Sequence, residues 1–462
     1  MTGLIDQITR PGLVILGAVA VLIMFGIASI YVSDTHYALG HDGPANAARQ
    51  FVYVVIGVGL GLLVARIGYH TIARHAYVLF FLATLALLPL FIAKLTHSSL
   101  GGLTPPRNGA YRWIQLSGIQ VQPSEFFKIA SVLALAWYLR YRKNYRRFLG
   151  LMVPFLIAAI PLALILMEPD LGTVMLMAPV LFFMLFMAGA RVRHLVIIAL
   201  LGLVALPLAW SHIKGYQRAR VTAVLLQSDW LRHDVIEHPD KYEGFVSRRQ
   251  ALEWAASSGF QLVHSKNAIG SGGPSGQGWG EGVYVESNLL PDRHNDFIFA
   301  MVAHQWGFIG SLLILACYAA IVLSGARIAS ATLEPSGRLL SFGLVMLIAL
   351  QATVNIAMST GLMPITGMTL PFVSHGGSSL LSGALAIGLL ISVSRHRPFM
   401  LANSPFEFTG ADAVPAHPAE HRSYVPGEIT PWSPARGGSD MANKRHSSTQ
   451  VARRIGQPHS MK

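Results

Sequence analysis

A single carboxylate, that of Asp296, stands where a long polar stretch runs into an apolar run long enough to cross a membrane. The boundary reads LLPDRHNDFIFAMVAHQWGFIG, from Leu289 to Gly310. Because charge is expensive at the edge of a hydrocarbon layer, an ionisable group held there is a candidate for function. Asp296 could act as a general base or as a helix N-cap, and the two roles are compatible.

Other polar residues are expected near the same boundary, at the ends of several apolar runs or in the loops between them. They are Arg112, Trp113, Gln122, Glu125, Lys128, Glu168, Asp170, Gln217, Arg220, Ser265, Lys266, Asp292, Arg293 and His294. Cations and anions that converge from different span ends predict a water-filled cavity open to the outside. Such a cavity could hold an anionic substrate beside a general base.

The individual residues leave alternatives open. Glu125 and Lys128 share one helix face, so they could neutralise each other, or Lys128 could offer its charge to a phosphate. Asp170, in MEPDLGT, is a candidate cap of the following helix and a weaker candidate for catalysis. Gln217 and Arg220, in GYQRARV, could be interfacial polar residues or anion ligands.

The glycine-dense run AIGSGGPSGQGWGEG at 268–282 lacks the GK[ST] ending of a phosphate-binding P-loop. It could form a backbone nest for an anion or a mobile flap over a cleft. His294 and His304 are not spaced as zinc ligands, and we predict no metal site. The cofactor stays unknown: an oxygen-ligated Mg²⁺ or Mn²⁺ near Asp296 is conceivable, but no motif supports it.

The composition indicates that these polar residues belong to a chain that lies largely in a membrane. The chain has 462 residues, 53% hydrophobic and 12% charged, whereas soluble domains carry about 25% charged residues. The net charge of +13 could suggest nucleic acid, but the basic residues cluster in short loops between apolar runs, as orientation signals do. We therefore expect no nucleic-acid partner. The single cysteine, Cys317, allows no disulfide within the chain.

We predict an all-α polytopic membrane protein with about ten transmembrane helices. The expected spans are 12–32, 51–67, 77–97, 124–140, 149–168, 171–190, 194–212, 296–323, 338–360 and 371–394. The loops on one side carry most of the arginines, which makes that side cytoplasmic and places both termini inside.

Three segments lie outside these spans. Residues 98–123 are expected to lie on the outer interface, with a short amphipathic piece around Trp113. A large extracytoplasmic loop is expected at about 213–295, between spans seven and eight, with one or two surface helices in 227–260. Residues 1–397 would form the membrane domain, and 398–462 a disordered cytoplasmic tail.

At these residues the chain resembles the SEDS family (shape, elongation, division and sporulation proteins). The matching segments, in order, are RWIQLSGIQVQPSEFFKIA at 112–130, MEPDLGT at 167–173, YQRAR at 216–220, HSKNAIGSGG at 264–273, LPDRHNDFIFA at 290–300 and GLMPITGMTLPFVSHGGSSLL at 361–381. Together they cover roughly residues 12–397. Three features favour the RodA-like branch, which serves elongation and rod shape: the arginine in DRHNDF, the motif QPSE and the motif MPITG. The FtsW-like division branch is the alternative.

The resemblance implies a polymerase of lipid II, the undecaprenyl-pyrophosphate-linked disaccharide-pentapeptide precursor of bacterial cell wall. It places the family's essential aspartate on Asp296, and further positions important for activity on Trp113, Glu125, Lys128, Asp170, Gln217 and Arg220. It also implies a multi-pass protein of the bacterial inner membrane, with its active site on the extracytoplasmic side. The implied partner is a class B penicillin-binding protein, a monofunctional transpeptidase.

In the expected reaction, Asp296 takes the proton of an acceptor hydroxyl and cations hold the departing pyrophosphate. Lys128 and Arg220 are the first candidates for those cations, with Gln217, Arg112 and Lys266 as further ligands. Arg293 and Ser265 are expected in supporting roles. A single displacement with one base implies inversion at the anomeric carbon.

Departures from the family pattern are Asn295, His304, Gln305 and His375, together with a longer insert at 227–260. His304 and Gln305 replace acidic residues, so a second carboxylate is not expected in that helix. The competing function is a lipid II flippase or other transporter, favoured by the Gly/Pro breaks around 361–377. A scaffold that only recruits a transpeptidase would leave the polar cluster unexplained.

Overall fold

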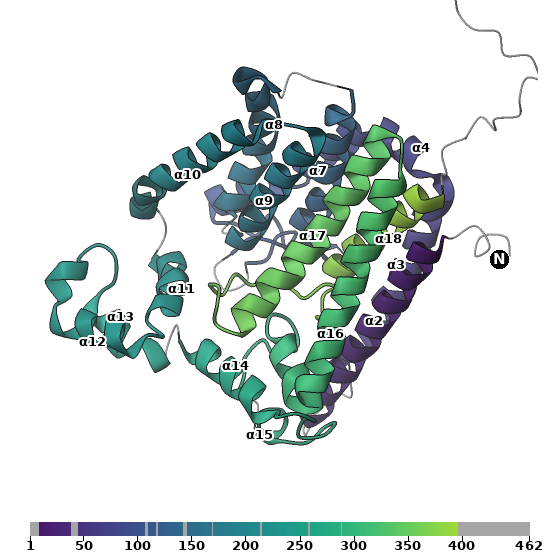
Figure 1. Cartoon of the computed structure of the whole chain (residues 1–462). Coiled ribbons are helices and arrows are strands. Elements are labelled where there is room, and N and C mark those ends of the chain that lie inside the picture. Colours follow the sequence, from purple (N-terminus) through teal and green to yellow (C-terminus); the bar gives the residue numbers. More distant parts are fainter. Residues whose placement is uncertain are drawn as a thin grey trace, which may run out of the picture. The chain divides into compact units, whose positions relative to one another are not determined.

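The computed structural model describes residues 9–37, 45–106, 110–116, 119–141, 146–168, 170–212, 215–256, 259–287 and 289–395 (Figure 1). These residues are mostly helical, and they include one two-stranded sheet. The tail predicted to be disordered, 398–462, lies outside the described residues.

Long apolar helices correspond to the predicted spans. They are α2 (Arg10–Tyr37), α3 (Ala45–Ile67), α7 (Pro123–Leu139), α8 (Phe148–Met167), α9 (Leu171–Ala188), α10 (Val192–His212), α16 (Ile298–Ala331), α17 (Pro335–Ser359) and α18 (Gly377–Arg395). The third predicted span is built from α5 (Ala76–Leu85) and α6 (Leu88–Thr96), which follow the short α4 (Tyr69–Arg74). Among the described residues, eight helical stretches are long and apolar enough to cross a membrane, and α7 and α10 fall outside that group. The protein is an all-α polytopic membrane protein.

The helices are apolar where they face outwards. Large side chains such as Leu149 and Val204 are 81% and 73% exposed, which suits contact with lipid and would be costly in water. Buried positions, in contrast, include polar side chains such as Gln351 and Asn355. Within the lipid-facing bundle, polar groups are therefore found in the interior, where they have protein partners.

The helices α17 and α18 lie at the centre of the bundle. About 67% of the apolar window of each is buried, against 17% for α3. The central α17 packs against α16, α7 and α9, while α18 packs against α3 and α16 packs against α2. Figure 1 shows α16, α17 and α18 running side by side in this arrangement.

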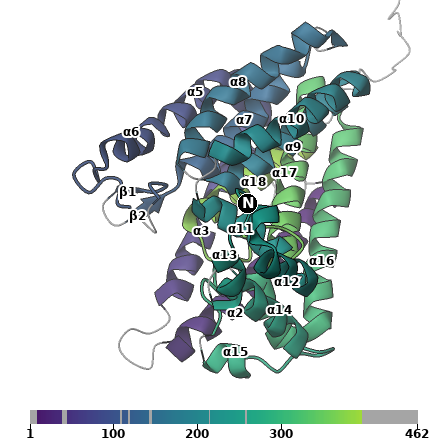
Figure 2. The ribbon, with the colours of Figure 1, turned by 90° about the vertical axis from the view of Figure 1, so that its left-hand side faces the viewer.

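The segment predicted to lie on the interface, 98–123, contains a β-hairpin that begins directly after Trp113 (Figure 2). Strand β1 (Ile114–Leu116) pairs antiparallel with β2 (Ile119–Val121), with Gln115 opposite Gln120. The alternation IQL and IQV is a strand pattern, but each strand has only three residues. So short an alternation is a weak signal in a segment rich in Gly and Pro.

The large loop has two α-helices within 227–260, as expected, and further helices on either side of that range. It contains α11 (Gly215–Leu225), α12 (Asp229–Glu237), α13 (Arg248–Leu252), α14 (Phe260–Ser271) and α15 (Val283–Glu286), with single 3₁₀ turns at Pro239–Tyr242 and Trp254–Ala256. Trp254 is buried, and its indole N–H donates to the Ala223 carbonyl at 2.9 Å. Helix α14 packs against α16 near the start of that helix, whereas Figure 1 shows α12 and α13 farther away, on the other side of α14. We call the end of the bundle where α16 begins and α17 ends the site end.

The glycine-dense run 268–282 begins in the last residues of α14 and is then hydrogen-bonded to a break in α16, which does not support a mobile flap. Helix α16 is interrupted at Gly307, whose φ of 61° and ψ of −156° are not helical. The N–H groups of Gln277 and Gly278 donate to the carbonyls of His304 and Gln305 at 2.9 and 3.2 Å. A Cβ on Gly276 would lie 2.1 Å from the Gln305 carbonyl oxygen, so only glycine allows this close approach.

Candidate active site

Asp296 lies two residues before α16 and is partly buried at the site end. The N-cap of α16 is Phe297, and no side chain caps the helix. In the described part of the chain, the Asp296 carboxylate makes no hydrogen bond or ion pair. The alternative that Asp296 serves as a helix cap is therefore wrong, and its carboxylate is left for another purpose.

The backbone at Asp296 is held firmly even though its carboxylate is not. The carbonyl of His294 accepts from the His375 N–H at 2.8 Å, and that of Asn295 accepts from the Ser374 hydroxyl at 2.6 Å. The carbonyl of Asp296 accepts from the Asn355 side-chain amide at 2.9 Å. Three consecutive carbonyls are thus tied to α17 and to the loop 360–376, which we call the site loop.

Gly367 of the site loop brings the carboxylate and a cation to one place. A Cβ on Gly367 would lie 3.5 Å from Asp296 Oδ2 and 3.9 Å from Arg220 Nη1. The φ of Gly367 is +74°, a conformation that a side chain would strain. The Asp296 carboxylate and the Arg220 guanidinium therefore border the same small space beside a glycine.

The surroundings of Asp296 suit proton transfer near neutral pH. Burial, and then the charge of Asp292, raises the pKa of Asp296 to about 7, although Arg220 and Arg112 act in the opposite direction. A carboxylate with a pKa close to the working pH is present in part as the base and still accepts a proton readily. This is the behaviour required of a general base.

Arg220 is the cation best placed to bind an anion beside Asp296. It is partly buried on α11 and, among the described residues, forms no hydrogen bond or ion pair. Gln217 is buried three residues earlier on the same helix. Arg112 is also partly buried, and its Nε donates to the Glu168 carbonyl at 3.3 Å.

Glu168, which the sequence places near the same boundary without a role of its own, is a buried acid. Burial, followed by the neighbouring charge of Asp170, raises the pKa of Glu168 to about 9. Its Oε1 atom has no hydrogen-bond partner among the described residues. At neutral pH this side chain is therefore protonated and uncharged.

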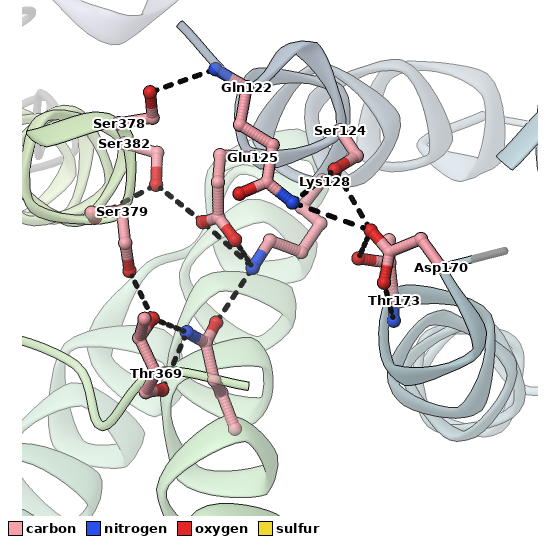
Figure 3. A network of polar contacts seen from close by, with 11 residues as sticks. Gln122, Ser124, Glu125, Lys128, Asp170, Thr173, Thr369, Ser378, Ser379 and Ser382 are labelled. Carbon is pink, nitrogen blue, oxygen red and sulfur yellow. Dashed lines mark hydrogen bonds and ion pairs between the residues drawn. The ribbon is translucent and has the colours of Figure 1, made fainter. Parts of the chain in front are cut away.

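Lys128 does not face the space beside Asp296. It is 2% exposed, and its Nζ lies 2.9 Å from both carboxylate oxygens of Glu125 and 2.9 Å from Gln351 Oε1. Ser382 also donates to the Glu125 carboxylate, at 3.2 Å (Figure 3). The pair neutralises itself inside the bundle, so this arrangement does not support the expected contact between Lys128 and pyrophosphate.

Asp170 has the structural role that the sequence favoured. Its carboxylate accepts from the Thr173 N–H at 3.3 Å and so caps α9. The same carboxylate accepts from the hydroxyls of Ser124 and Thr173 at 3.1 and 2.8 Å (Figure 3). Asp170 thereby ties the start of α9 to the start of α7.

The remaining predicted site residues are distributed around the site end. Ser265 is buried, and its hydroxyl donates to the Ser359 carbonyl at 2.7 Å. Arg293 is buried and donates to the carbonyls of Tyr284, Val285 and Ser33. Lys266 is exposed and donates to Gln227 at 3.2 Å, and Trp113 is partly buried just before β1. Ser265 and Arg293 thus join backbone segments, as supporting residues do.

Sequence reasoning missed Asn355, Gln351 and Gly367. A signal for the two amides was present, since they lie four residues apart inside an otherwise apolar run. Gly367 gave no comparable signal because it lies in a stretch with several glycines. Among the described residues, no group of three or more His, Cys, Asp or Glu side chains is arranged to hold a metal ion.

Known proteins resemble this chain over most of its length. A family profile described as "Cell cycle protein" (FtsW, RodA, SpoVE) matches residues 13–398. A probable peptidoglycan glycosyltransferase FtsW of Geobacter metallireducens is 34% identical over 84% of this chain and 96% of its own. Stage V sporulation protein E of Bacillus subtilis is 34% identical over 84% of this chain and 98% of its own. A solved chain described under "Structural coordination of polymerization and crosslinking by a peptidoglycan synthase complex" is 27% identical, with a TM-score of 0.64 over 83% of this chain and 97% of that chain.

The relatives do not support the assignment to the elongation branch. They carry the division name FtsW and a sporulation name, and they match nearly their full length. The assignment to the elongation branch rests on three short motifs, which carry less information than the full chain. The chain therefore belongs to the SEDS family of FtsW, RodA and SpoVE cell cycle proteins.

Proposed function

We propose that this protein is a peptidoglycan glycosyltransferase that polymerises lipid II into glycan strands, with Asp296 as the general base. The observation that carries the proposal is an unpaired carboxylate with a pKa of about 7 that shares a small space with Arg220. The names of the relatives supply the class of reaction, and the family resemblance supplies the lipid-linked disaccharide-pentapeptide as substrate.

The reaction joins the 4-hydroxyl of an acceptor sugar to the anomeric carbon of the growing strand. Asp296 accepts the hydroxyl proton as the new bond forms, and undecaprenyl pyrophosphate leaves with the electrons of the broken bond. One displacement with one base inverts the configuration at the anomeric carbon. A base of this kind contributes typically 10²–10⁴-fold to the rate.

The leaving pyrophosphate needs cations, and we assign this role to Arg220 and Arg112. Both are partly buried, and both are close enough to Asp296 to lower the pKa of its carboxyl. A guanidinium can donate two parallel hydrogen bonds to phosphate oxygens. We do not assign Lys128 as a direct ligand of the pyrophosphate, because its ammonium group already donates to Glu125 and Gln351.

The polyprenyl tail of the substrate requires an apolar path along the bundle. An apolar cavity of about 520 Å³ lies beside α5, α7 and α18. Its lining includes Leu79, Leu82, Phe126, Leu133 and Leu389, and it reaches the hairpin at Ile114 and Val121. A tail lying there would keep its head group at the site end.

The proposed biological setting is based on the names of the relatives and on the family resemblance. We assign the chain to the division or sporulation branch, in agreement with the names of these two relatives. The partner is a class B penicillin-binding protein, and the protein lies in the inner membrane with Asp296 on the extracytoplasmic side. Residues 1–397 form the membrane domain, and 398–462 a cytoplasmic tail.

The test is polymerisation of purified lipid II by the purified chain, with and without its transpeptidase. Asp296→Asn and Asp296→Ala should abolish glycan product, whereas Asp292→Asn, an exposed carboxylate four residues away, should keep it. Product from Asp296→Asn at the wild-type rate would remove Asp296 from the mechanism. Translocation of labelled lipid II without any product from the wild type would select the flippase.

A further inference from the structure

Two buried amides on α17 hold the site loop. Asn355 and Gln351 lie four residues apart, so both face the same side of the helix. Gln351 Nε2 donates to the Thr369 carbonyl at 3.1 Å, and Asn355 Nδ2 donates to the Met368 carbonyl at 2.6 Å. One turn of α17 thus binds two consecutive carbonyls of the loop, immediately after Gly367.

Asn355 makes a second bond, and this one reaches the proposed base. Its Nδ2 also donates to the Asp296 carbonyl at 2.9 Å. A primary amide has two N–H groups, so a single side chain can serve both carbonyls. Asn355 therefore joins the residue that carries the base to the loop residue next to Gly367.

These two bonds determine the width of the reaction space. Asp296 lies on one side of it and Gly367 on the other, and the point where a Gly367 Cβ would stand is only 3.5 Å from Asp296 Oδ2. A shift of the Asp296 segment would change the distance of its carboxylate from both Gly367 and Arg220, and a shift of the loop would change its distance from Gly367. Because misplacement by about 1 Å can cost roughly 10²-fold in rate, this distance must be held closely.

The ion pair inside the bundle fixes the other amide. Gln351 Oε1 accepts from Lys128 at 2.9 Å, and Lys128 is in turn held by Glu125. Figure 3 shows this pair between α7 and α18, with Thr369 close by. Lys128 thus acts on the site through Gln351 and Thr369, which gives this buried charge a role without substrate contact.

A purely structural amide would be expected to have all of its polar atoms paired. Asn355 is fully buried, yet its Oδ1 atom has no hydrogen-bond partner among the described residues. An unpaired buried oxygen is destabilising, and a smaller or apolar side chain would avoid that cost. The position keeps an amide because its two donors are needed.

We propose that Asn355 is a positioning residue for the polymerisation reaction, which holds Asp296 at its working distance from Gly367 and Arg220. The proposal rests on the proposed function of Asp296. Asn355 itself does not touch the substrate, since its side chain is enclosed by protein. Its effect should therefore appear in the chemical step and leave substrate binding unchanged.

The first test compares Asn355→Asp with Gln50→Glu in lipid II polymerisation. The acid at 355 has the shape of the amide but at most one donor, so kcat should fall at least tenfold while KM changes less than threefold. Gln50 is an equally buried amide that holds the same loop at Ser374 and Gly376, without contact to Asp296. Its variant should keep kcat within about threefold of wild type.

The second test does not depend on activity. Infrared difference spectra, wild type minus Asp296→Asn, follow the titration of the Asp296 carboxyl, whose pKa is about 7. Asn355→Ser adds no charge and keeps one donor, so it should move the midpoint by at least half a pH unit because the distance to Arg220 changes. If Asn355→Asp does not fold, Asn355→Ser also replaces it in the kinetic test, with the same expected result.

The outcomes separate this inference from the proposed function. Wild-type kcat and an unmoved titration midpoint in a folded Asn355 variant would overturn the positioning role and leave Asp296 as the base. An equal fall of kcat in Gln50→Glu would also overturn it, since any loosening of the loop would then suffice. If Asp296→Asn stays active, the proposed function fails, and the infrared midpoint alone decides whether Asn355 positions Asp296.

Discussion

Replacing Arg220 with glutamine should move the pH dependence of polymerisation to higher pH. A cation beside a carboxyl group favours its charged form, so Arg220 lowers the pKa of Asp296 within an environment that otherwise raises it to about 7. Without that charge the pKa rises further. The base form predominates only above the pKa, so the acidic limb of the kcat profile must shift towards alkaline pH.

The size of the shift follows from the geometry at Gly367. Asp296 Oδ2 and Arg220 Nη1 lie 3.5 and 3.9 Å from the same point, so they are separated by about 7 Å at most. At that separation two unit charges interact by about 2.4 kcal/mol at an effective dielectric constant of 20, and by about 0.6 kcal/mol in water. One pKa unit corresponds to about 1.4 kcal/mol, so the limb should move by roughly 0.4 to 1.7 pH units.

The assay is kcat at saturating lipid II between about pH 5 and pH 9, for wild type, Arg220→Gln and Arg220→Lys. Lysine keeps the charge, so its limb should move less than that of glutamine, although it loses the paired hydrogen bonds of a guanidinium. Arg220→Gln should also lower kcat across the whole range, because the leaving pyrophosphate loses a ligand. An acidic limb at the same pH in Arg220→Gln and wild type would refute the pairing of Asp296 with Arg220.

Two further predictions concern stability. Lys128→Met should destabilise the fold by about 3–5 kcal/mol, because it leaves Glu125 buried and unpaired, and Lys128→Met combined with Glu125→Leu should recover most of that loss in denaturant titrations. Glu168 has a folded pKa of about 9, so its stabilising contribution is complete below about pH 4.5 and is lost as pH rises towards 9. The stability of Glu168→Gln lacks this pH dependence. Its unfolding temperature should therefore be higher than that of wild type at pH 8 and nearly the same at pH 5. A difference in unfolding temperature that grows at low pH would contradict the burial of Glu168.

The apolar helices could be predicted because length and hydropathy determine them almost alone. The run before Arg66 needs no tertiary information to be recognised as α3, and the same holds for α8 and α9. The boundaries were less predictable. The last span was expected from 371, but α18 begins at Gly377, because Pro371 and Ser374 belong to the site loop.

Long-range contacts could not be predicted from local sequence. The glycine-dense run at 268–282 has no pattern that announces its partner, since the partner is a break in α16 about thirty residues further on. The same limit applies to Lys128. Its spacing from Glu125 predicted a shared helix face, but whether that face pointed to a wet cavity or to Gln351 depended on how α7 packs against α17.

Asp296 was predictable for a different reason. An acid at the edge of an apolar run is conspicuous whatever the fold, because the energetic cost is visible in the sequence itself. Its partners were predictable only in part. Arg220 was selected from a short motif, whereas Gly367 was not, since a glycine that leaves space for a substrate looks like any other loop glycine.

The structure distinguishes two kinds of polar group, and the distinction argues for where the reaction takes place. Deep in the bundle the charges are paired, as Glu125 and Lys128 are, and such pairs keep a polar interior stable. Around Asp296 several polar atoms lack partners among the described residues, namely His294 Nδ1, Asn295 Oδ1 and His375 Nε2. Unpaired groups cost stability, and a fold retains them together where a substrate or water completes their bonds. These atoms lie near the Asp296 carboxylate, which is also unpaired. This clustering argues that the reaction takes place at Asp296, and not at the buried ion pair of Glu125 and Lys128.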